Sequence, residues 1–275
     1  METHVSIRNM GASSTVQATE MSLRVLEAIQ ERGGARIGEL VDTLDVSKST
    51  VYNHLTTLEA NEFLVKEGDQ YYISLKFLNF GEHARSRKHA YELASNAVRE
   101  LTDRTDEEAD FVVEEHGRIM TLSHSYHKGN TYVGDINLNN PISSGRNGTY
   151  YYMHNTASGK AILANLPESR VEAIIDKWGL PQKTDTTLAD REALFDELKL
   201  IRKQGYALDD EEFTEGLRSV GMAVQYPNGR LVGALSVSGP RYRLTDDVVQ
   251  NELPEELETV IEELERDIAN ATRSG

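Results

Sequence analysis

The stretch SKSTVYNHLTTLEANEFLV, residues Ser47–Val65, changes from polar to apolar along its length. Ser47 is a residue type that caps helices, and Val51, Leu55 and Leu58 follow it at the three- and four-residue spacing of one helix face. The strand-like run FLV comes directly afterwards. We therefore predict a helix that ends near residue 60, with its first turn facing a partner and its last turn facing a core.

Two helical patterns precede this stretch, and a hairpin follows it. The first starts at Met21 and stops at Gly33-Gly34, the second covers Ile37 to Leu44, and FLVKEGDQYYI is typical of strand, turn and strand. The inner face of the first helix is predicted to contain Leu23, Val25, Leu26 and Ile29. The order helix, helix, turn, helix, hairpin is that of a winged helix-turn-helix, whose third helix enters the major groove of DNA.

The outer face of the third helix and the hairpin carry the groups expected to contact DNA. Hydroxyl, amide and ammonium groups suit hydrogen bonds to phosphates and base edges, although on an isolated helix they would merely be solvated. The order of the elements favours DNA binding. The predicted DNA-binding residues are Ser47, Lys48, Ser49, Thr50, Tyr52, Asn53 and Thr57 on the helix, with Lys66 and Gln70 on the hairpin.

The charge of the chain has the wrong sign for a nucleic-acid binder. The 275 residues include 29 Lys and Arg against 45 Asp and Glu, a formal net charge of −16, although phosphate contacts normally rest on cations. Residues 1–85 carry 8 basic and 12 acidic side chains, and residues 86–275 carry 21 and 33, so the excess is not confined to one tail. We interpret it as adaptation to high salt, as in a halophilic archaeon; the alternative is an ordinary acidic cytosolic protein.

Composition excludes several classes of chemistry. The chain has no cysteine, so disulfides, thiolate catalysis and cysteine-ligated metal centres are impossible. The sequence has no GxSxG elbow, and the spacing of His124 and His127 does not converge on a metal in a strand-to-loop region. It also lacks a run of roughly 18 apolar residues and an apolar signal core. We expect a cytoplasmic protein that is not an enzyme and that uses no cofactor, metal or membrane.

Residues 81–101 continue as a helical pattern with an apolar stripe of nearly heptad spacing. The stripe consists of Ala90, Leu93, Ala94, Ala97, Val98 and Leu101. Such a helix is a rigid linker, half of a dimer seam, or a helix that packs on its own domain. We predict a linker or dimerisation helix.

The last 174 residues mix strand and helix patterns. A hairpin is predicted over residues 111–123, and helices over residues 156–166, 167–178 and 190–204 and from Pro254 onward, with a loop between Lys128 and Tyr150. A second hairpin, RSVGMAVQYPNGRLVGALSVSG, turns at Asn228-Gly229. The fold class is therefore α+β with an antiparallel sheet.

The second hairpin has one bulky face and one small face, because successive strand side chains point in opposite directions. The small face consists of Ser219, Gly221, Ala223, Ala234, Ser236 and Ser238. It either leaves a hollow lined with hydroxyls or lies beneath a closely packed helix. Nearby, HNTASGKA presents helix-start N–H groups that suit an anion, and the acidic run DDEE, residues 209–212, either positions a polar ligand or cation or is a solvated loop.

Together these residues resemble the IclR family of transcriptional regulators. The resemblance covers about residues 18–270 and is carried by MSLRVLEAIQERGG, IGELVDTLDVSKSTVYNHLTTLEANEFL, YYISLKFLNFG, MHNTASGKAILANLPE, GYALDDEE and GLRSVGMAVQYPNGRLVGALSVSGPRYRLT. It implies a flexible tail over residues 1–17, a winged helix-turn-helix over residues 18–80, the linker helix over residues 81–101 and a GAF-like effector domain over residues 102–275. It also implies a homodimer or tetramer.

By motif position, the resemblance implies an effector site. The residues are Ala157, Ser158, Asp209, Ser219, Ser236 and Ser238. Two departures from the family pattern stand out: Ser219 replaces a typical Cys, and Asn53 replaces a typical Arg of the recognition helix. The first suggests a different effector, and the second removes a cation that usually contacts DNA.

These implications lead to one functional prediction. The chain is expected to be a ligand-responsive repressor or activator of catabolic genes that senses a small organic or sugar acid. It would bind a pseudo-palindromic double-stranded operator. The acidic charge and the missing Arg favour an alternative, a protein–protein adaptor or a non-DNA-binding ligand sensor with a degenerate winged helix.

Overall fold

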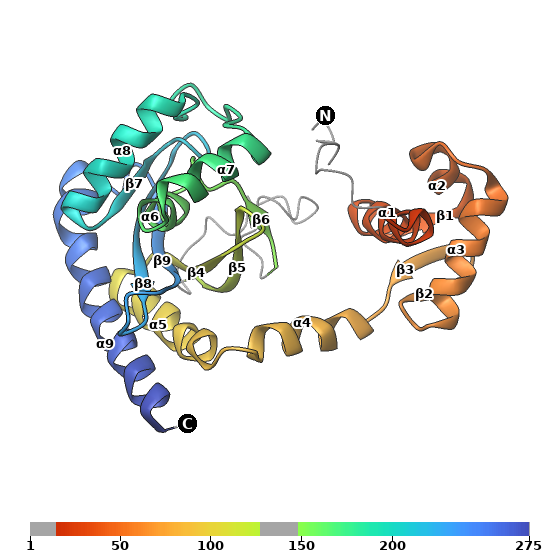
Figure 1. Ribbon diagram of the computed structural model, residues 1–275, viewed down its shortest axis with the longest axis horizontal. Helices are drawn as coiled ribbons and strands as arrows, with labels where there is room; N and C mark the ends of the chain where they lie inside the picture. Colours follow the sequence, from red (N-terminus) through yellow and green to blue (C-terminus); the bar gives the residue numbers. More distant parts are fainter. Residues whose placement is uncertain (1–14, 127–147, 275) are drawn as a thin grey trace. The chain divides into compact units, whose positions relative to one another are not determined.

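The computed structural model describes residues 15–126 and 148–274. The chain divides into two compact units, Met1–Ala84 and Arg85–Gly275, and each unit has a hydrophobic core of its own (Figure 1). Most of the predicted N-terminal tail, and most of the predicted loop between Lys128 and Tyr150, lie outside the described residues.

The N-terminal unit packs three helices on a small antiparallel sheet. The helices are α1 (Gln17–Arg32), α2 (Ile37–Leu44) and α3 (Lys48–Ala60), and the strands are β1 (Ala35–Arg36), β2 (Leu64–Glu67) and β3 (Gln70–Ile73) in the order β1-β3-β2. Gly33 takes a left-handed φ of 67°, which suits a residue without Cβ at the end of α1. Val51 and Leu55 of α3 are fully buried in the core, so the predicted winged helix-turn-helix is confirmed.

Two details of this unit differ from the prediction. Leu23 is 54% exposed, because it lies two residues, or about 200° around the helix, from the core residue Val25. Strand β1 was not predicted, because its two residues have no pattern of their own. Its pairing of Ala35 with Tyr71 of β3 becomes evident only in the folded sheet.

The single helix predicted over residues 81–101 is wrong. The chain forms α4 (Lys76–Ser86) and α5 (His89–Thr105), with a break at Arg87-Lys88 between them. The apolar stripe on α5 lies in the core of its own unit, against the sheet and the last helix; its fully or nearly buried members are Ala90, Ala94, Ala97, Val98 and Leu101. The stripe is therefore internal, whereas no residue of α4 is buried.

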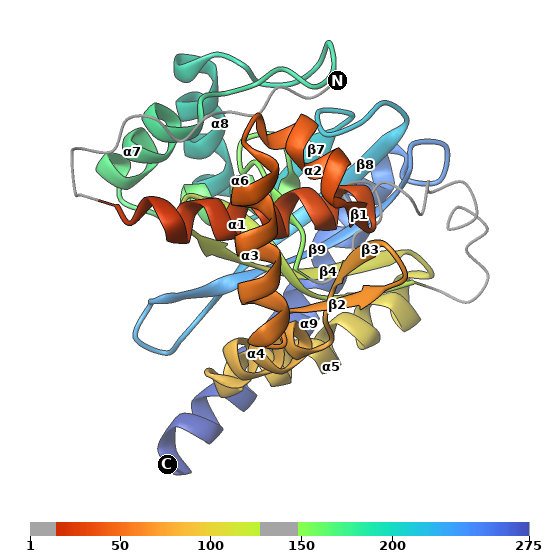
Figure 2. The same cartoon turned by 90° about the vertical axis from the view of Figure 1, so that its right-hand side faces the viewer.

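The C-terminal unit is built on one six-stranded antiparallel sheet. Its order is β6 (Tyr150–Tyr151), β5 (Arg118–Ser125), β4 (Glu108–Glu115), β9 (Leu231–Pro240), β8 (Leu217–Gln225) and β7 (Ala207–Asp210). Figures 1 and 2 show α5 and α9 (Leu253–Ser274) on one face, and α6 (Ala157–Ala164), α7 (Glu168–Trp178) and α8 (Arg191–Gln204) on the other. A short π-helix, Val248–Glu252, leads into α9. The predicted α+β class is confirmed.

Strand alternation divides the core of this unit into two layers. On β4, Phe111 packs with α5 and α9, whereas Val112 packs with α6 and its neighbours. The even-numbered residues of β4 therefore share the face that α6 covers. This assignment of faces decides which polar side chains of the sheet meet.

Candidate DNA-facing helix and effector site

The first turn of α3 carries a cluster of linked hydroxyls at the surface. The Ser47 Oγ accepts a hydrogen bond from the Thr50 backbone N at 3.1 Å, as the sequence predicts for a cap. The same Oγ lies 2.8 Å from the hydroxyl oxygens of Ser49 and Thr50. These groups are held in place before any partner is bound.

The remaining predicted residues of α3 differ in whether their polar groups already have hydrogen-bond partners. Lys48, Tyr52 and Asn53 are exposed, with Tyr52 at 54%. Thr57 is exposed too, but its hydroxyl donates to the Asn53 carbonyl oxygen at 2.8 Å. The exposed end of α3 therefore offers one ammonium, one phenol and one amide beside the hydroxyl cluster.

The hairpin formed by β2 and β3 places Lys66 at the surface, with its Nζ 5.2 Å from the centre of the Tyr71 ring. Gln70 is half-buried, and its Oε1 accepts from the Tyr72 hydroxyl at 2.5 Å. At the turn, the Arg36 Nε donates to Asp69 Oδ2 at 2.6 Å. Arg36 is a cation that sequence reasoning missed, because only the β1–β3 pairing brings it to this hairpin.

The small face of the second hairpin forms as predicted. In the β8–β9 register Ser219 pairs with Ser238, Gly221 with Ser236 and Ala223 with Ala234. The Ser238 hydroxyl donates to the Ser219 Oγ at 2.9 Å. Because directly paired residues share a face, these six residues form one contiguous patch.

Helix α6 rests directly on this patch. A side chain at Gly221 would come within 2.6 Å of the Ser158 backbone N, so the alternative of a close-packed helix holds at Gly221. The Thr156 side chain caps α6 by accepting from the Gly159 N at 3.2 Å. The N–H groups of Ala157 and Ser158 belong to the first turn, where intrahelical acceptors do not exist.

The acidic run after α8 is not a solvated loop, since Asp209 and Glu212 are buried. The Asp209 Oδ1 accepts from the backbone N of Glu212 at 2.8 Å and of Phe213 at 3.2 Å, so this oxygen organises the turn. Burial and the neighbouring Glu212 charge raise the pKa of Asp209 to about 7. Lys160 of α6, only 1% exposed, bonds to Glu212 and, at 3.3 Å, to Glu197.

The structure adds two carboxyl groups that the sequence analysis missed. Glu108 of β4 pairs with Ser238, and Asp110 pairs with Ser236, so both lie on the face covered by α6. Burial raises the pKa of Glu108 to about 7, opposed by a hydrogen bond from Tyr126. Burial and the Glu108 charge raise the pKa of Asp110 well above its usual range. The alternation of polar and apolar residues in EADFVV was the only sequence signal for these two carboxyl groups. It does not show which side chains they face until the partner strand is known.

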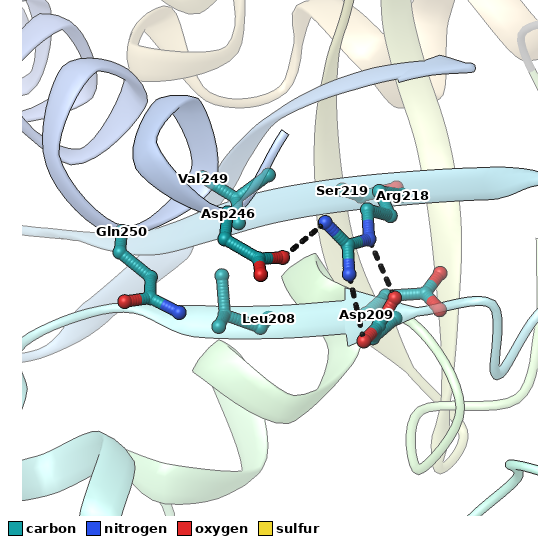
Figure 3. A pocket seen from close by; sticks show the side chains of 8 residues that line it. Leu208, Asp209, Arg218, Ser219, Asp246, Val249 and Gln250 are labelled. Atoms are coloured by element: carbon teal, nitrogen blue, oxygen red, sulfur yellow. Dashed lines mark hydrogen bonds and ion pairs between the residues drawn. The ribbon is translucent and has the colours of Figure 1, made fainter. Parts of the chain in front are cut away.

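A small cavity lies near β7 and β8, on the face covered by the π-helix and α9. It has a volume of about 50 Å³ and is lined by Leu208, Asp209, Asp210, Arg218, Ser219, Asp246, Val249 and Gln250 (Figure 3). The Arg218 guanidinium donates to Asp210 at 2.6 Å and to Asp246 at 2.7 Å. Organic ligands usually occupy several hundred Å³, so this cavity suits a water molecule or two.

Within residues 15–126 and 148–274, no three His, Asp or Glu side chains are grouped closely enough to hold a metal ion. Over the same residues, no helix has the length and apolar character needed to cross a membrane.

Comparison with known proteins gives a consistent result. Residues 83–266 match the family described as bacterial transcriptional regulator IclR C-terminal, and residues 19–68 match the IclR helix-turn-helix domain. The chain is 29% identical over 247 residues to a Halobacterium salinarum protein named "Probable HTH-type transcriptional regulator ArcR", covering 90% of this chain and 91% of that one. It is 28% identical over 265 residues to the Escherichia coli HTH-type transcriptional repressor AllR, covering 94% and 92%.

Solved structures share the fold. The Thermotoga maritima IclR structure superposes with a TM-score of 0.72 at 24% identity, covering 92% of this chain and 98% of that one. The inducer-binding domain of Acinetobacter PobR, solved with 3-hydroxybenzoic acid, superposes with a TM-score of 0.55 at 22% identity, covering 63% of this chain and 96% of that domain.

Proposed function

The chain belongs to the IclR family of transcriptional regulators, and we propose that it couples operator binding by α3 to a small molecule held beside the first turn of α6. The single observation that carries this proposal is the pairing register of β8, β9 and β4. It gathers three serines and two acids from separate parts of the chain on one face, next to the start of a helix. No enzymatic role is proposed.

The DNA-binding surface is the exposed end of α3 with the hairpin beside it. Its residues are Ser47, Lys48, Ser49, Thr50, Tyr52, Asn53, Thr57, Lys66 and Gln70. Lys48 is the cation that α3 itself contributes, so the attraction to phosphate is weak for one copy. Specific binding therefore requires two half-sites engaged together on a pseudo-palindromic operator.

A second copy of the chain would supply the other half-site, as a homodimer or within a tetramer. An apolar surface around α4 suits this contact: Leu75 is 86%, Leu78 62% and Phe80 53% exposed. These residues replace the α5 stripe as the proposed dimer surface, because the α5 stripe is used inside its own unit.

The effector site consists of Ala157, Ser158, Asp209, Ser219, Ser236 and Ser238. The α6 N–H groups and the serine hydroxyls would hold the acidic group of a small organic or sugar acid. Binding there would shift the affinity of the dimer for operators of catabolic genes, as repressor or activator. The competing function, an adaptor with a degenerate winged helix, would show no specific DNA binding at any salt concentration.

The test is effector response in a serine double variant. A duplex enriched from random DNA by the wild-type protein serves as operator, and a panel of small carboxylic and sugar acids serves as effectors. Ser236→Ala/Ser238→Ala should weaken the response by roughly ten- to a hundred-fold, the loss of a buried hydrogen bond to a charged group at about 1.5–3 kcal/mol. An unchanged response with intact operator binding would move the effector site elsewhere.

A further inference from the structure

Buried polar groups without partners lie on the α6 side of the sheet. Asn155 Oδ1, one residue before the cap of α6, and Asp110 Oδ1 are buried and have no hydrogen-bond partner in the described part of the chain. Ser158 and Ser236 lie between them and are 5% and 4% exposed. Folded proteins rarely leave such groups unpaired without a use for them.

The register gives the positions of these groups on the sheet. Asp209, Ser219, Ser238 and Glu108 form one row across β7, β8, β9 and β4. In the next row Gly221, Ser236, Asp110 and His124 cross β8, β9, β4 and β5. Adjacent strands lie about 4.8 Å apart, so Asp110 is roughly 10 Å from Gly221, where α6 begins.

The two ends of this surface have opposite chemistry. At Gly221 the α6 N–H groups are donors and favour an anionic oxygen. Two strands away, Asp110 and Glu108 present carboxyl groups, which accept hydrogen bonds when ionised. Ser236, between them, can both donate and accept.

We propose that the effector is an acid that also carries a hydroxyl or amino group a few bonds from its acidic group, with Asp110 and Glu108 receiving that second group. This rests on the proposed effector site and narrows its ligand class. A plain carboxylic acid would satisfy the α6 end and leave Asp110 Oδ1 buried and unpaired. Asp110 and Glu108 thus select for ligands with two functional groups. A ligand without the second group leaves their polar atoms unpaired, and this lowers its affinity.

The raised pKa of Asp110 agrees with this arrangement. Burial disfavours the charged form of this carboxyl in the empty protein, and an amino group or a hydroxyl of the ligand would stabilise that form on binding. The groups around it are Glu108 on its own strand, Ser236 on β9, His124 on β5, and Tyr126, whose hydroxyl bonds to Glu108.

Two matched pairs of acids test the proposal by calorimetry at pH 7.5: 5-aminopentanoate against pentanoate, and gluconate against hexanoate. In the wild-type protein, at least one donor-bearing acid should bind at least tenfold more tightly than its partner. In the Asp110→Leu variant, the ratio of the two affinities within each pair should fall to near one. Asp246→Asn, an acid on the opposite face of the sheet, serves as control and should leave the ratio unchanged.

Stability supplies a readout that needs no ligand. Asp110→Leu removes a carboxyl oxygen, Oδ1, that is buried and unpaired, so the empty protein should melt about 2–6 °C higher than wild type. A lower melting temperature would assign Asp110 a structural role and overturn the proposal. Equal binding within both pairs, or no binding by either donor-bearing acid, would overturn it as well.

The serine double variant separates this failure from failure of the proposed function. Suppose that Ser236→Ala/Ser238→Ala weakens the binding of all four acids alike, and that the wild-type protein does not prefer the donor-bearing acid in either pair. The effector site then stands, and only the role of Asp110 is wrong. If the serine variant changes nothing while the acids still bind, the site itself is misplaced.

Discussion

On α3 the Ser47 hydroxyl lies 2.8 Å from the hydroxyls of Ser49 and Thr50 at the surface, whereas on the C-terminal sheet Asp110 Oδ1 is buried and has no partner among the described residues. A surface that meets a large polyanion can satisfy its polar groups with water or with each other until DNA arrives. An internal site for a small molecule cannot, because water is largely excluded. Its unpaired groups lower stability until the ligand restores their bonds.

The largest expected effect comes from a substitution in the buried charge cluster of the C-terminal unit. Lys160→Met leaves Glu212 buried without its cation, which should lower the free energy of unfolding by about 3–5 kcal/mol. Urea denaturation at pH 7.5 measures it. Lys199→Met, which breaks an exposed pair with Asp196, is the control and should change stability by about 0.5 kcal/mol or less. A loss of under about 1 kcal/mol for Lys160→Met would show that the buried charge cluster is not needed.

The next largest effect is expected from substitutions on the exposed face of α3. The triple variant Thr50→Ala/Tyr52→Ala/Asn53→Ala should lower operator affinity by roughly a hundredfold or more, since each base contact contributes about 1–3 kcal/mol. Fluorescence anisotropy on the selected duplex measures it. Glu59→Ala, at the far end of α3, should not weaken binding. Normal affinity of the triple variant would remove α3 from the DNA interface.

Stability against pH sharpens the contrast further. Glu108 and Asp209 have pKa values raised to about 7, so the folded protein binds more protons than the unfolded chain between about pH 4 and 7. The free energy of unfolding should therefore fall as pH rises through this window, by about 1.4 kcal/mol per pH unit for each proton of difference. Burial lowers the pKa of His154, which acts in the opposite direction below pH 6.5.

Glu108→Gln isolates one of these groups. Its unfolding free energy, measured in urea between pH 5 and 8, should fall less steeply than that of wild type. Parallel curves for the two proteins would mean that Glu108 is ionised normally in the fold.

The smallest effect concerns the cap of α3. Ser47→Ala removes the acceptor for the Thr50 N–H and should cost about 1 kcal/mol of stability. Thermal unfolding followed by circular dichroism measures it, with the exposed Thr56→Ala as control. A cost well above that of a surface cap would mean that the hydroxyl cluster supports the core as well.

Much of this organisation was predictable from local pattern. The spacing of Val51, Leu55 and Leu58 placed α3, and the alternation around Asn228-Gly229 placed both faces of the β8–β9 hairpin. The break at Arg87-Lys88 was missed, because residues 85–89 contain no Gly or Pro that would mark the end of a helix. Strand β1 was missed because two residues carry no periodicity.

The sequence by itself determined most of the helices and strands, since helix and strand periodicity, caps and turn residues act over a few residues. It also determined that a face of Ser, Gly and Ala exists, because alternation is a property of one strand. Only the tertiary structure decided that Asp110 lies opposite Ser236 and that α6 begins over Gly221. These contacts join segments more than 60 residues apart, and their register depends on how the whole sheet pairs rather than on any local pattern.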